Sequence, residues 1–370
     1  MSHRHRLAAG ALALLLASAV APSGAGARGD EGAPALVLRP PSANRIYHAA
    51  FPDFGGPEDR VSASRIRAFE HLAGRRIAWA YFSNNWLGGH IRFPASRVRA
   101  ISQAGRVPFI RMMARSGWGR GADPNFPLRS IDSGAWDPEL RRWCDRARDT
   151  QIPLLVEFGT EVNGDWFPWN GRWNGAGRRD RYGDPLQADG PERFRDAYRR
   201  IVDLCRDERA GNITWFFHVD VGGWPRKPWN RIANYWPGDA YVDWVGLSDY
   251  GPQVPGEPWV SFRRRLDRAY SRIAALSASA PIAVLEYGAT EDPHHPSAKA
   301  RWIRHAIRDV AARRWPRIAA LSYWHEDWRN ANGSASALRL DSSARVTRAY
   351  RRGISRPAFT ARPRFGPRRP

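Results

Sequence analysis

Short apolar runs alternate with amphipathic segments along most of the chain. The run IPLLVEFGTE at 152–161 has the length of a buried strand, whereas GPERFRDAYRRIVDLCRDE at 190–208 repeats its apolar residues at helical spacing. Eight such pairs follow one another. The predicted strands occupy residues 44–51, 76–86, 106–114, 152–161, 212–220, 241–250, 281–290 and 317–327. The predicted helical segments occupy residues 62–74, 94–105, 137–149, 190–208, 230–239, 260–277, 297–313 and 342–352.

Eight strand–helix units predict a parallel (β/α)8 barrel, the TIM barrel, in a single domain of class α/β. An open doubly wound sheet is the alternative. It would usually carry a Gly-rich phosphate loop after its first strand, but the segment HAAFPDFGGPED there has no GxGxxG pattern. The barrel is therefore the better prediction.

Residues 1–27 have the pattern of a secretory signal peptide. Arg4 and Arg6 precede an apolar run from Leu7 to Ala21, and small residues end at Ala27. The run is short for a membrane span, and no later segment is apolar for long enough to cross a bilayer. We expect a secreted protein, extracellular or periplasmic, with an uncleaved anchor as the alternative. The remaining parts would be an N-terminal linker at 28–44, a catalytic barrel at 45–352 and a disordered Arg/Pro-rich tail at 353–370.

The net charge of +22 comes almost entirely from arginine, since only Lys227 and Lys299 are lysines. The charge is spread along the chain, so it predicts weak attraction to polyanions but no nucleic-acid partner. The two cysteines, Cys144 and Cys205, each lie on the apolar stripe of a predicted helix. Buried free thiols are the favoured interpretation, and secretion would also permit a disulfide.

Polar and aromatic residues gather where the predicted strands end, which is the face that carries the active site of such barrels. Glu161 ends the fourth strand and Glu286 ends the seventh. Hydrolysis of a glycosidic bond needs two carboxyl groups, one to protonate the leaving oxygen and one to attack or to activate water. The loop 165–173 behind Glu161 is rich in tryptophan, whose rings match the apolar faces of sugars. The candidate substrate-binding residues at the strand ends and in this loop are Asn85, Trp86, Asn163, Trp166, Trp169, His218, Tyr250 and Trp324.

The strings GTEVNGDWFPW, YWPGDAYVDWVGLSDYG, IAVLEYGAT and SYWHED resemble glycoside hydrolase family 26 over nearly the whole predicted barrel. The resemblance implies that Glu161 is the acid/base and Glu286 the nucleophile of a retaining reaction. It also implies that the Tyr250 hydroxyl lies beside the nucleophile and that Trp324 lies under the reacting sugar. Members of the family cut β-1,4-mannans, and some cut mixed-linkage β-glucans or β-1,3-xylans.

Two positions depart from the family pattern. Thr160 stands where the family usually has a histidine directly before the acid/base, which puts specificity for mannan in doubt. The pocket beside Glu161 should then be wider, or be filled by His218 or Asn85. Glu157 stands where the family tends to have arginine. Because alternate strand residues share a face, Glu157 should point into the barrel and pair with Arg111.

No cofactor or metal site is expected. His294 and His295 beside Glu291 and Asp292 are better explained as an exposed loop than as metal ligands. The sequence therefore predicts a secreted, monomeric glycosidase whose partner is a β-linked polysaccharide of mannan or related glucan type. The alternative is a non-catalytic barrel that binds a polysaccharide in envelope or exopolysaccharide biology.

Overall fold

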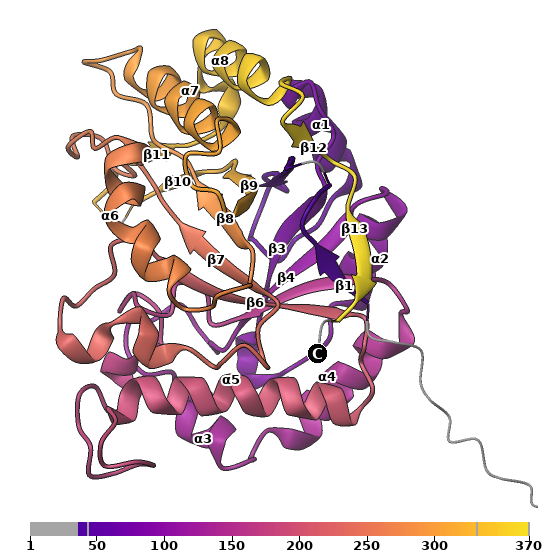
Figure 1. Ribbon diagram of the computed structural model, residues 1–370, viewed down its shortest axis with the longest axis vertical. Helices are drawn as coiled ribbons and strands as arrows, with labels where there is room; N and C mark the ends of the chain where they lie inside the picture. The colour runs from indigo at the N-terminus through magenta and orange to yellow at the C-terminus, as the bar shows by residue number, and fades with distance from the viewer. Residues whose placement is uncertain (1–35, 43, 331, 369–370) are drawn as a thin grey trace, which may run out of the picture. The chain divides into compact units, whose positions relative to one another are not determined.

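The computed structural model describes residues 36–42, 44–330 and 332–368, and eight parallel strands form its centre (Figure 1). Each strand pairs with the next, and the first closes on the last, Phe51 lying opposite Trp324. The predicted (β/α)8 barrel is confirmed. Its strands are β2 (Ile46–Phe51), β3 (Trp79–Asn85), β4 (Val107–Met113), β5 (Leu154–Phe158), β6 (Ile213–Asp220), β7 (Trp244–Ser248), β8 (Ile282–Tyr287) and β9 (Ile318–Trp324).

Helices surround the strands (Figure 1). They are α1 (Ala63–Ala73), α2 (Ala95–Gln103), α3 (Leu128–Asp132), α4 (Asp137–Asp149), α5 (Asp189–Asp207), α6 (Phe262–Ala274), α7 (Ala298–Ala311) and α8 (Ala344–Ile354). Between β6 and β7 the structure has two 3₁₀ turns, η3 (Pro228–Asn230) and η4 (Ile232–Tyr235). Pro228 and Pro237 bound this stretch, and proline restricts both a helix interior and the residue before it. The segment predicted as helical at 230–239 thus contains short 3₁₀ turns instead of an α-helix.

The longest helix shows how sequence pattern and packing agree. Along α5 the buried residues recur at helical spacing, as in Phe194, Ala197 and Ile201. Its first turn carries Asp189 and Glu192, whose charges suit the positive end of the helix dipole. The helix therefore begins and packs as its sequence predicts.

A disulfide joins Cys144 of α4 to Cys205 of α5. Both cysteines are buried, as predicted, but the preference for free thiols is wrong. The two inward stripes face one another, which brings the Cα atoms to 4.8 Å, within the range that a disulfide spans. The register between two helices is a tertiary property, so the stripes alone did not reveal it.

Both ends of the described chain close the N-terminal end of the barrel. β1 (Leu36–Arg39) pairs antiparallel with β13 (Arg364–Pro367), and β12 (Phe359–Thr360) pairs in parallel with the start of β2. The Tyr47 hydroxyl at the start of β2 donates to the carbonyl of Arg39 and accepts from the backbone N–H of Arg364. These strands lie at the end of the barrel opposite to the candidate site.

The described parts of the predicted linker at 28–44 and of the predicted disordered tail at 353–370 thus contain strands, and the prediction of disorder is wrong for the described part of the tail. The Arg/Pro-rich composition hid one apolar anchor, because Phe359 is fully buried. The predicted signal peptide lies outside the described residues. Within the described ranges, we find no helix with the length and apolar character that a membrane crossing requires.

Candidate active site

A pocket of about 630 Å³ opens at the C-terminal ends of the strands. Glu161 and Glu286 both line it, together with Tyr250 and the rings of Trp166 and Trp324. Five of the ten predicted site residues therefore meet in one pocket. They come from the loop after β5, the ends of β8 and β9, and the residues that follow β7.

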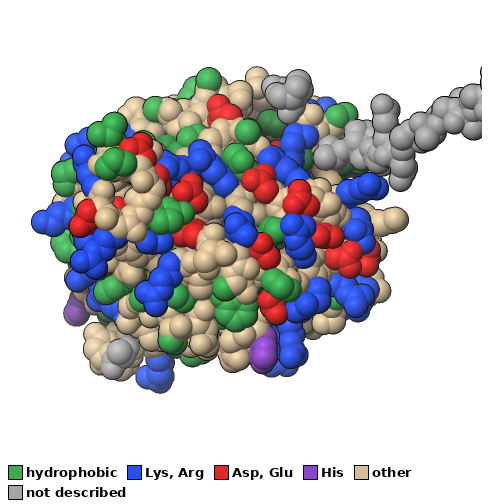
Figure 2. Space-filling view, turned by 90° about the horizontal axis from the view of Figure 1, so that it is seen from below, with side chains coloured by type: hydrophobic (Ala, Val, Ile, Leu, Met, Phe, Trp, Pro, Cys, Tyr) green, Lys and Arg blue, Asp and Glu red, His purple; other side chains and the backbone are tan. Residues whose placement is uncertain are grey.

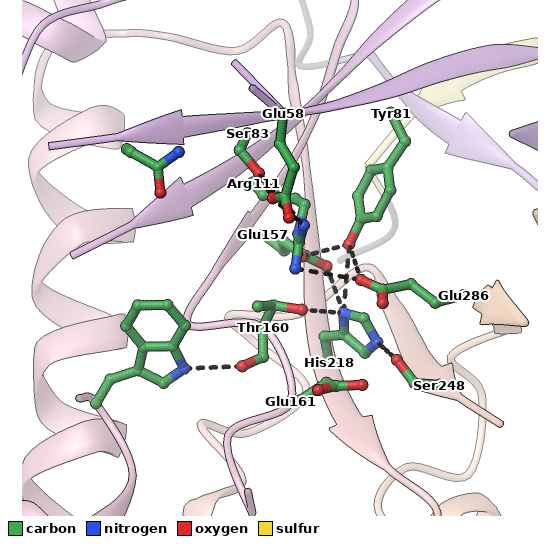
Figure 3. Close-up of polar contacts among 12 residues, drawn as sticks. Glu58, Tyr81, Ser83, Arg111, Glu157, Thr160, Glu161, His218, Ser248 and Glu286 are labelled. Atoms are coloured by element: carbon green, nitrogen blue, oxygen red, sulfur yellow. Dashed lines mark hydrogen bonds and ion pairs between the residues drawn. The ribbon is translucent and has the colours of Figure 1, made fainter. Parts of the chain in front are cut away.

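Glu286 in β8 receives three polar contacts. The Tyr250 hydroxyl donates to its Oε2 at 2.8 Å, and the Tyr81 hydroxyl lies 3.5 Å from its Oε1. The Arg111 guanidinium lies 3.3 Å from Oε1, as Figure 3 shows. Burial raises the pKa of Glu286, while the positive charge of Arg111 opposes that rise. The cation and the hydrogen bond from Tyr250 favour the charged form of this carboxyl group.

Glu161 follows β5 in a sharp turn. Its φ of +48° lies in the left-handed region, which a residue with a Cβ seldom adopts. Gly159, two residues earlier, has φ of +68°, and a Cβ there would lie 2.4 Å from the ring of Phe194. Such backbone strain is concentrated at functional sites. The turn aims the Glu161 carboxyl at the pocket, where its Oε2 accepts a hydrogen bond of 2.6 Å from Trp166 Nε1.

Burial, reinforced by the negative charges of Glu286 and Asp220, raises the pKa of Glu161 to about 8. No arginine or lysine forms an ion pair with Glu161 in the part of the chain that the structure describes. Glu161 and Glu286 therefore share one buried pocket, but of the two only Glu286 contacts a cation within the described chain. A carboxyl with a high pKa can donate a proton near neutral pH, and a carboxylate beside a cation can act as a nucleophile.

A buried polar layer lies next to these two carboxyl groups, deeper in the barrel (Figure 3). Glu157 in β5 accepts a hydrogen bond of 2.5 Å from Tyr81 and lies 2.9 Å from His218 Nδ1. The predicted contact with Arg111 is present at 3.5 Å. Burial favours the neutral acid, but the charges of His218 and Arg111 outweigh it and lower the pKa of Glu157.

His218 is the centre of this layer. Burial opposes its protonation, yet the charge of Glu157 outweighs burial and raises the pKa of His218. Its Nδ1 also lies 2.8 Å from the Thr160 hydroxyl, and its Nε2 lies 2.8 Å from that of Ser248. His218 thus contacts Thr160 in the buried layer. It is fully buried and does not line the pocket, so its role as a direct sugar ligand is not supported.

Three tryptophan rings line the pocket. Trp166 is 40% exposed, and Trp324 stacks on Phe51 with ring centroids 4.3 Å apart. The Arg111 guanidinium lies over the Trp324 ring at 4.9 Å. Trp328, which belongs to the hairpin of β10 (Asp327–Arg329) and β11 (Ala335–Ala337), adds a further ring. Flat rings beside two carboxyl groups suit a carbohydrate chain.

Similarity to known proteins agrees with this geometry. The family model described as Glycosyl hydrolase family 26 matches residues 138–275. The predicted resemblance to glycoside hydrolase family 26 is confirmed for this segment. It is 25% identical over 300 residues to Endoglucanase H of Acetivibrio thermocellus, a match that covers 79% of this chain and 29% of that protein. It is 28% identical over 162 residues to Beta-1,3-xylanase TXYA of a Vibrio species, covering 44% of this chain and 30% of that protein.

The matched regions thus span about a third of the length of these curated relatives. Among solved structures, the chain is similar to the catalytic domain of an endo-β-1,4-mannanase from Bacillus sp. JAMB-750. The TM-score is 0.59 at 16% identity, and the match covers 85% of this chain and 87% of that one. This likeness shows that the two proteins share a fold.

Besides His218, four predicted substrate-binding residues lie outside this pocket, and their assignment is not supported. Trp86 is fully buried between the rings of Phe126 and Phe158. Trp169 is also buried, and its Nε1 donates to the carbonyl oxygen of Thr160. An aromatic residue at or after a strand end can therefore pack in the core as readily as it can bind a sugar.

Asn163 and Asn85 make structural contacts instead. The Asn163 side chain donates to the carbonyl of Asp220 and accepts from its N–H, both at 2.8 Å, and so fixes the loop after β5 to the end of β6. Asn85 accepts from Arg115 Nε at 2.6 Å and donates to Asp59 at 3.2 Å. Both contacts hold loops in place.

Two residues of the site, Tyr81 and Glu58, could hardly be recognised from the sequence. Tyr81 lies inside β3, where the sequence pattern does not distinguish it from other buried strand residues. Its hydroxyl nevertheless lies near both Glu157 and Glu286. Glu58 lies in a loop after β2, and its Oε2 accepts from Arg111 at 2.8 Å. A charged residue in a loop gives no sign of its partner until the fold is known.

His295 contacts Asp292 on an exposed loop, at 2.9 Å. Within the described ranges, no group of three or more histidine, cysteine or acidic side chains is arranged to hold a metal ion.

Proposed function

We propose that this chain is a secreted, monomeric glycosidase that hydrolyses a β-linked polysaccharide with retention of configuration. Glu161 is the general acid and base, and Glu286 is the nucleophile. The observation that carries the proposal is the contrast between two carboxyl groups in one pocket. Glu286 contacts a cation, whereas the pKa of Glu161 rises to about 8.

In the first step Glu161 gives its proton to the glycosidic oxygen while Glu286 attacks the anomeric carbon. The bond to the leaving sugar breaks, and a covalent glycosyl ester forms on Glu286. Tyr250 and Arg111 orient the attacking carboxylate through their contacts with its two oxygens. The rings of Trp166 and Trp324 hold the sugar chain beside it.

The second step reverses the roles. Esterification removes the negative charge of Glu286, one of the influences that hold the pKa of Glu161 high. The pKa of Glu161 therefore falls when the ester forms, and its carboxylate can take a proton from water as the water attacks the same carbon. The two inversions give net retention. The same charge coupling thus serves both steps.

The disulfide between Cys144 and Cys205 supports secretion, because such bonds persist in oxidising compartments. Substrates named among the relatives differ, so the test is a panel of β-1,4-mannan, mixed-linkage β-glucan and β-1,3-xylan. We expect release of reducing sugar from at least one polymer by the native chain and none by Glu286→Ala. Tight binding to a polymer without turnover by the native chain would instead support the non-catalytic barrel.

A further inference from the structure

A second groove lies on the outside of the barrel, away from the pocket of the two carboxyl groups. It has a volume of about 390 Å³ and runs between α7 and α8, which lie side by side at the top of Figure 1. Gly353 brings the two helices together, since a Cβ there would lie 2.8 Å from Ile307 of α7. We call this feature the arginine groove, after the six arginines that line it. They are Arg301, Arg304, Arg345, Arg348, Arg352 and Arg356.

The spacing of these arginines follows the helices. Arg301 and Arg304 lie one turn apart on α7, and Arg345, Arg348 and Arg352 follow one face of α8 at intervals of three and four residues. Residues at such intervals lie about 5–6 Å apart on a helix surface. All six are exposed. The result is a row of positive charges on each wall of one groove.

No acidic side chain lines the arginine groove, and none of its six arginines forms a salt bridge with another described residue. The face seen in Figure 2 is different, because red acidic side chains lie among the blue ones there. On α4, for example, Arg141, Arg142 and Arg148 each pair with a carboxylate. The groove therefore concentrates uncompensated charge, and like charges at this spacing repel one another.

We propose that the arginine groove binds an anionic polysaccharide, a polymer with repeated carboxylate or sulfate groups, independently of the hydrolytic pocket. Guanidinium groups match such oxyanions because they donate two parallel hydrogen bonds. A neutral mannan, glucan or xylan offers no charge to these side chains. The groove therefore serves a polymer other than the neutral substrate and holds the enzyme on it.

The surroundings favour a polysaccharide over a membrane or a nucleic acid. The large hydrophobic side chains that are exposed in the described chain lie at Leu36, Leu87, Trp118, Trp166, Leu186 and Trp224. None of them belongs to α7 or α8. The groove thus lacks the apolar residues that would enter a bilayer and the exposed rings on which bases would stack. The arginine groove therefore presents positive charge to a ligand and no large exposed hydrophobic side chain.

The test compares two triple variants with the same loss of charge. In the groove variant Arg345, Arg348 and Arg352 become glutamine, which keeps helix propensity. In the control variant Arg141, Arg142 and Arg148 of α4 become glutamine. Binding of each full-length protein to polygalacturonate, to dextran sulfate and to neutral dextran is measured by titration calorimetry at two salt concentrations, with Tm as the check of folding.

We expect the native chain to bind one or both anionic polymers, less tightly at the higher salt, and to ignore neutral dextran. The groove variant should bind at least about tenfold more weakly, and the control variant within about twofold of native. Polygalacturonate and dextran sulfate distinguish carboxylate from sulfate recognition.

Equal weakening in both variants would mean that only net charge matters and would overturn the proposal. Tighter binding to duplex DNA or to anionic phospholipid vesicles than to both polymers would also overturn it. Turnover of neutral oligosaccharide, measured in parallel, is expected to be the same in all three proteins.

Discussion

His218 Nδ1 lies 2.9 Å from the carboxylate of Glu157, and both side chains are fully buried beneath the two candidate catalytic carboxyl groups. Tyr81 and Arg111 are further partners of Glu157. Glu157→Gln leaves positive charge in the buried layer without its counter-charge. We expect the free energy of unfolding to fall by about 3–5 kcal/mol, measured by denaturant titration. An unchanged stability would show that Glu157 exists as the neutral acid.

The same contact predicts how stability depends on pH. Glu157 has a lowered pKa, so its stabilising effect is present above its ordinary value of 4.5 and is lost as the pH falls through the folded value. His218 has a raised pKa, so its effect is present below 6.5 and is lost as the pH rises through the folded value. The stability difference between the native chain and Glu157→Gln should therefore be largest between these two ordinary values. A difference that stays constant from acid to alkaline pH would contradict this ion pair.

The roles of the two carboxyl groups predict different losses. Glu286→Ala should abolish turnover on every substrate, because no covalent ester can form. Glu161→Ala should retain the first step with an activated aryl leaving group, which needs no protonation. Pre-steady-state bursts on an aryl glycoside would measure this difference.

Glu326 supplies the control for that experiment. It also lines the pocket, and burial raises its pKa to about 8, but its carboxylate accepts a hydrogen bond from Trp324 Nε1 at 3.0 Å. Glu326→Ala should therefore weaken substrate binding more than it slows chemistry. If Glu326→Ala abolished turnover while Glu286→Ala did not, the nucleophile would be misassigned. The anomer released first, followed by proton NMR, tests retention in the same samples, and an initial α-product would exclude it.

The pKa of Glu161 gives a prediction about charge coupling. Because Glu286 is one of the groups that raise the pKa of Glu161, Glu286→Gln should lower it. Carbon NMR of labelled glutamate side chains would follow the titration in both proteins. In the native chain kcat/KM should fall as the pH rises through about 8, since the acid then loses its proton. If the pKa of Glu161 were the same in both proteins, the proposed fall of this pKa on ester formation would be contradicted.

Sequence periodicity was enough to predict the barrel and to place Glu161 and Glu286 at its mouth, because a strand end is fixed by a local pattern. It was not enough for Trp86 and Trp169, since burial depends on neighbours such as Phe126 that are distant in the chain. The contact of Tyr81 with Glu157 and the pairing of Cys144 with Cys205 could also be identified only from the fold. What the sequence could not reveal was in each case a contact between separate elements.

Thr160, directly before Glu161, is a position where this chain departs from the family 26 pattern. The Thr160 side chain is fully buried, and its hydroxyl lies 2.8 Å from His218 Nδ1. Thr160→His alone would therefore collide with His218. The useful variant is Thr160→His combined with His218→Ala, with His218→Ala as its matched control.

The double variant places an imidazole directly before Glu161, where the resemblance to family 26 implies a histidine that bonds a sugar hydroxyl near C2, the carbon at which mannose and glucose differ. A site that bonds a hydroxyl discriminates strongly against the sugar that lacks it there, whereas a site without that donor does not. We expect the native chain to be weak on plain β-mannan. The double variant should raise the ratio of kcat/KM on β-mannan to that on mixed-linkage β-glucan by about tenfold relative to His218→Ala. Strong mannanase activity in the native chain, with the same ratio in both variants, would show that Thr160 does not set specificity.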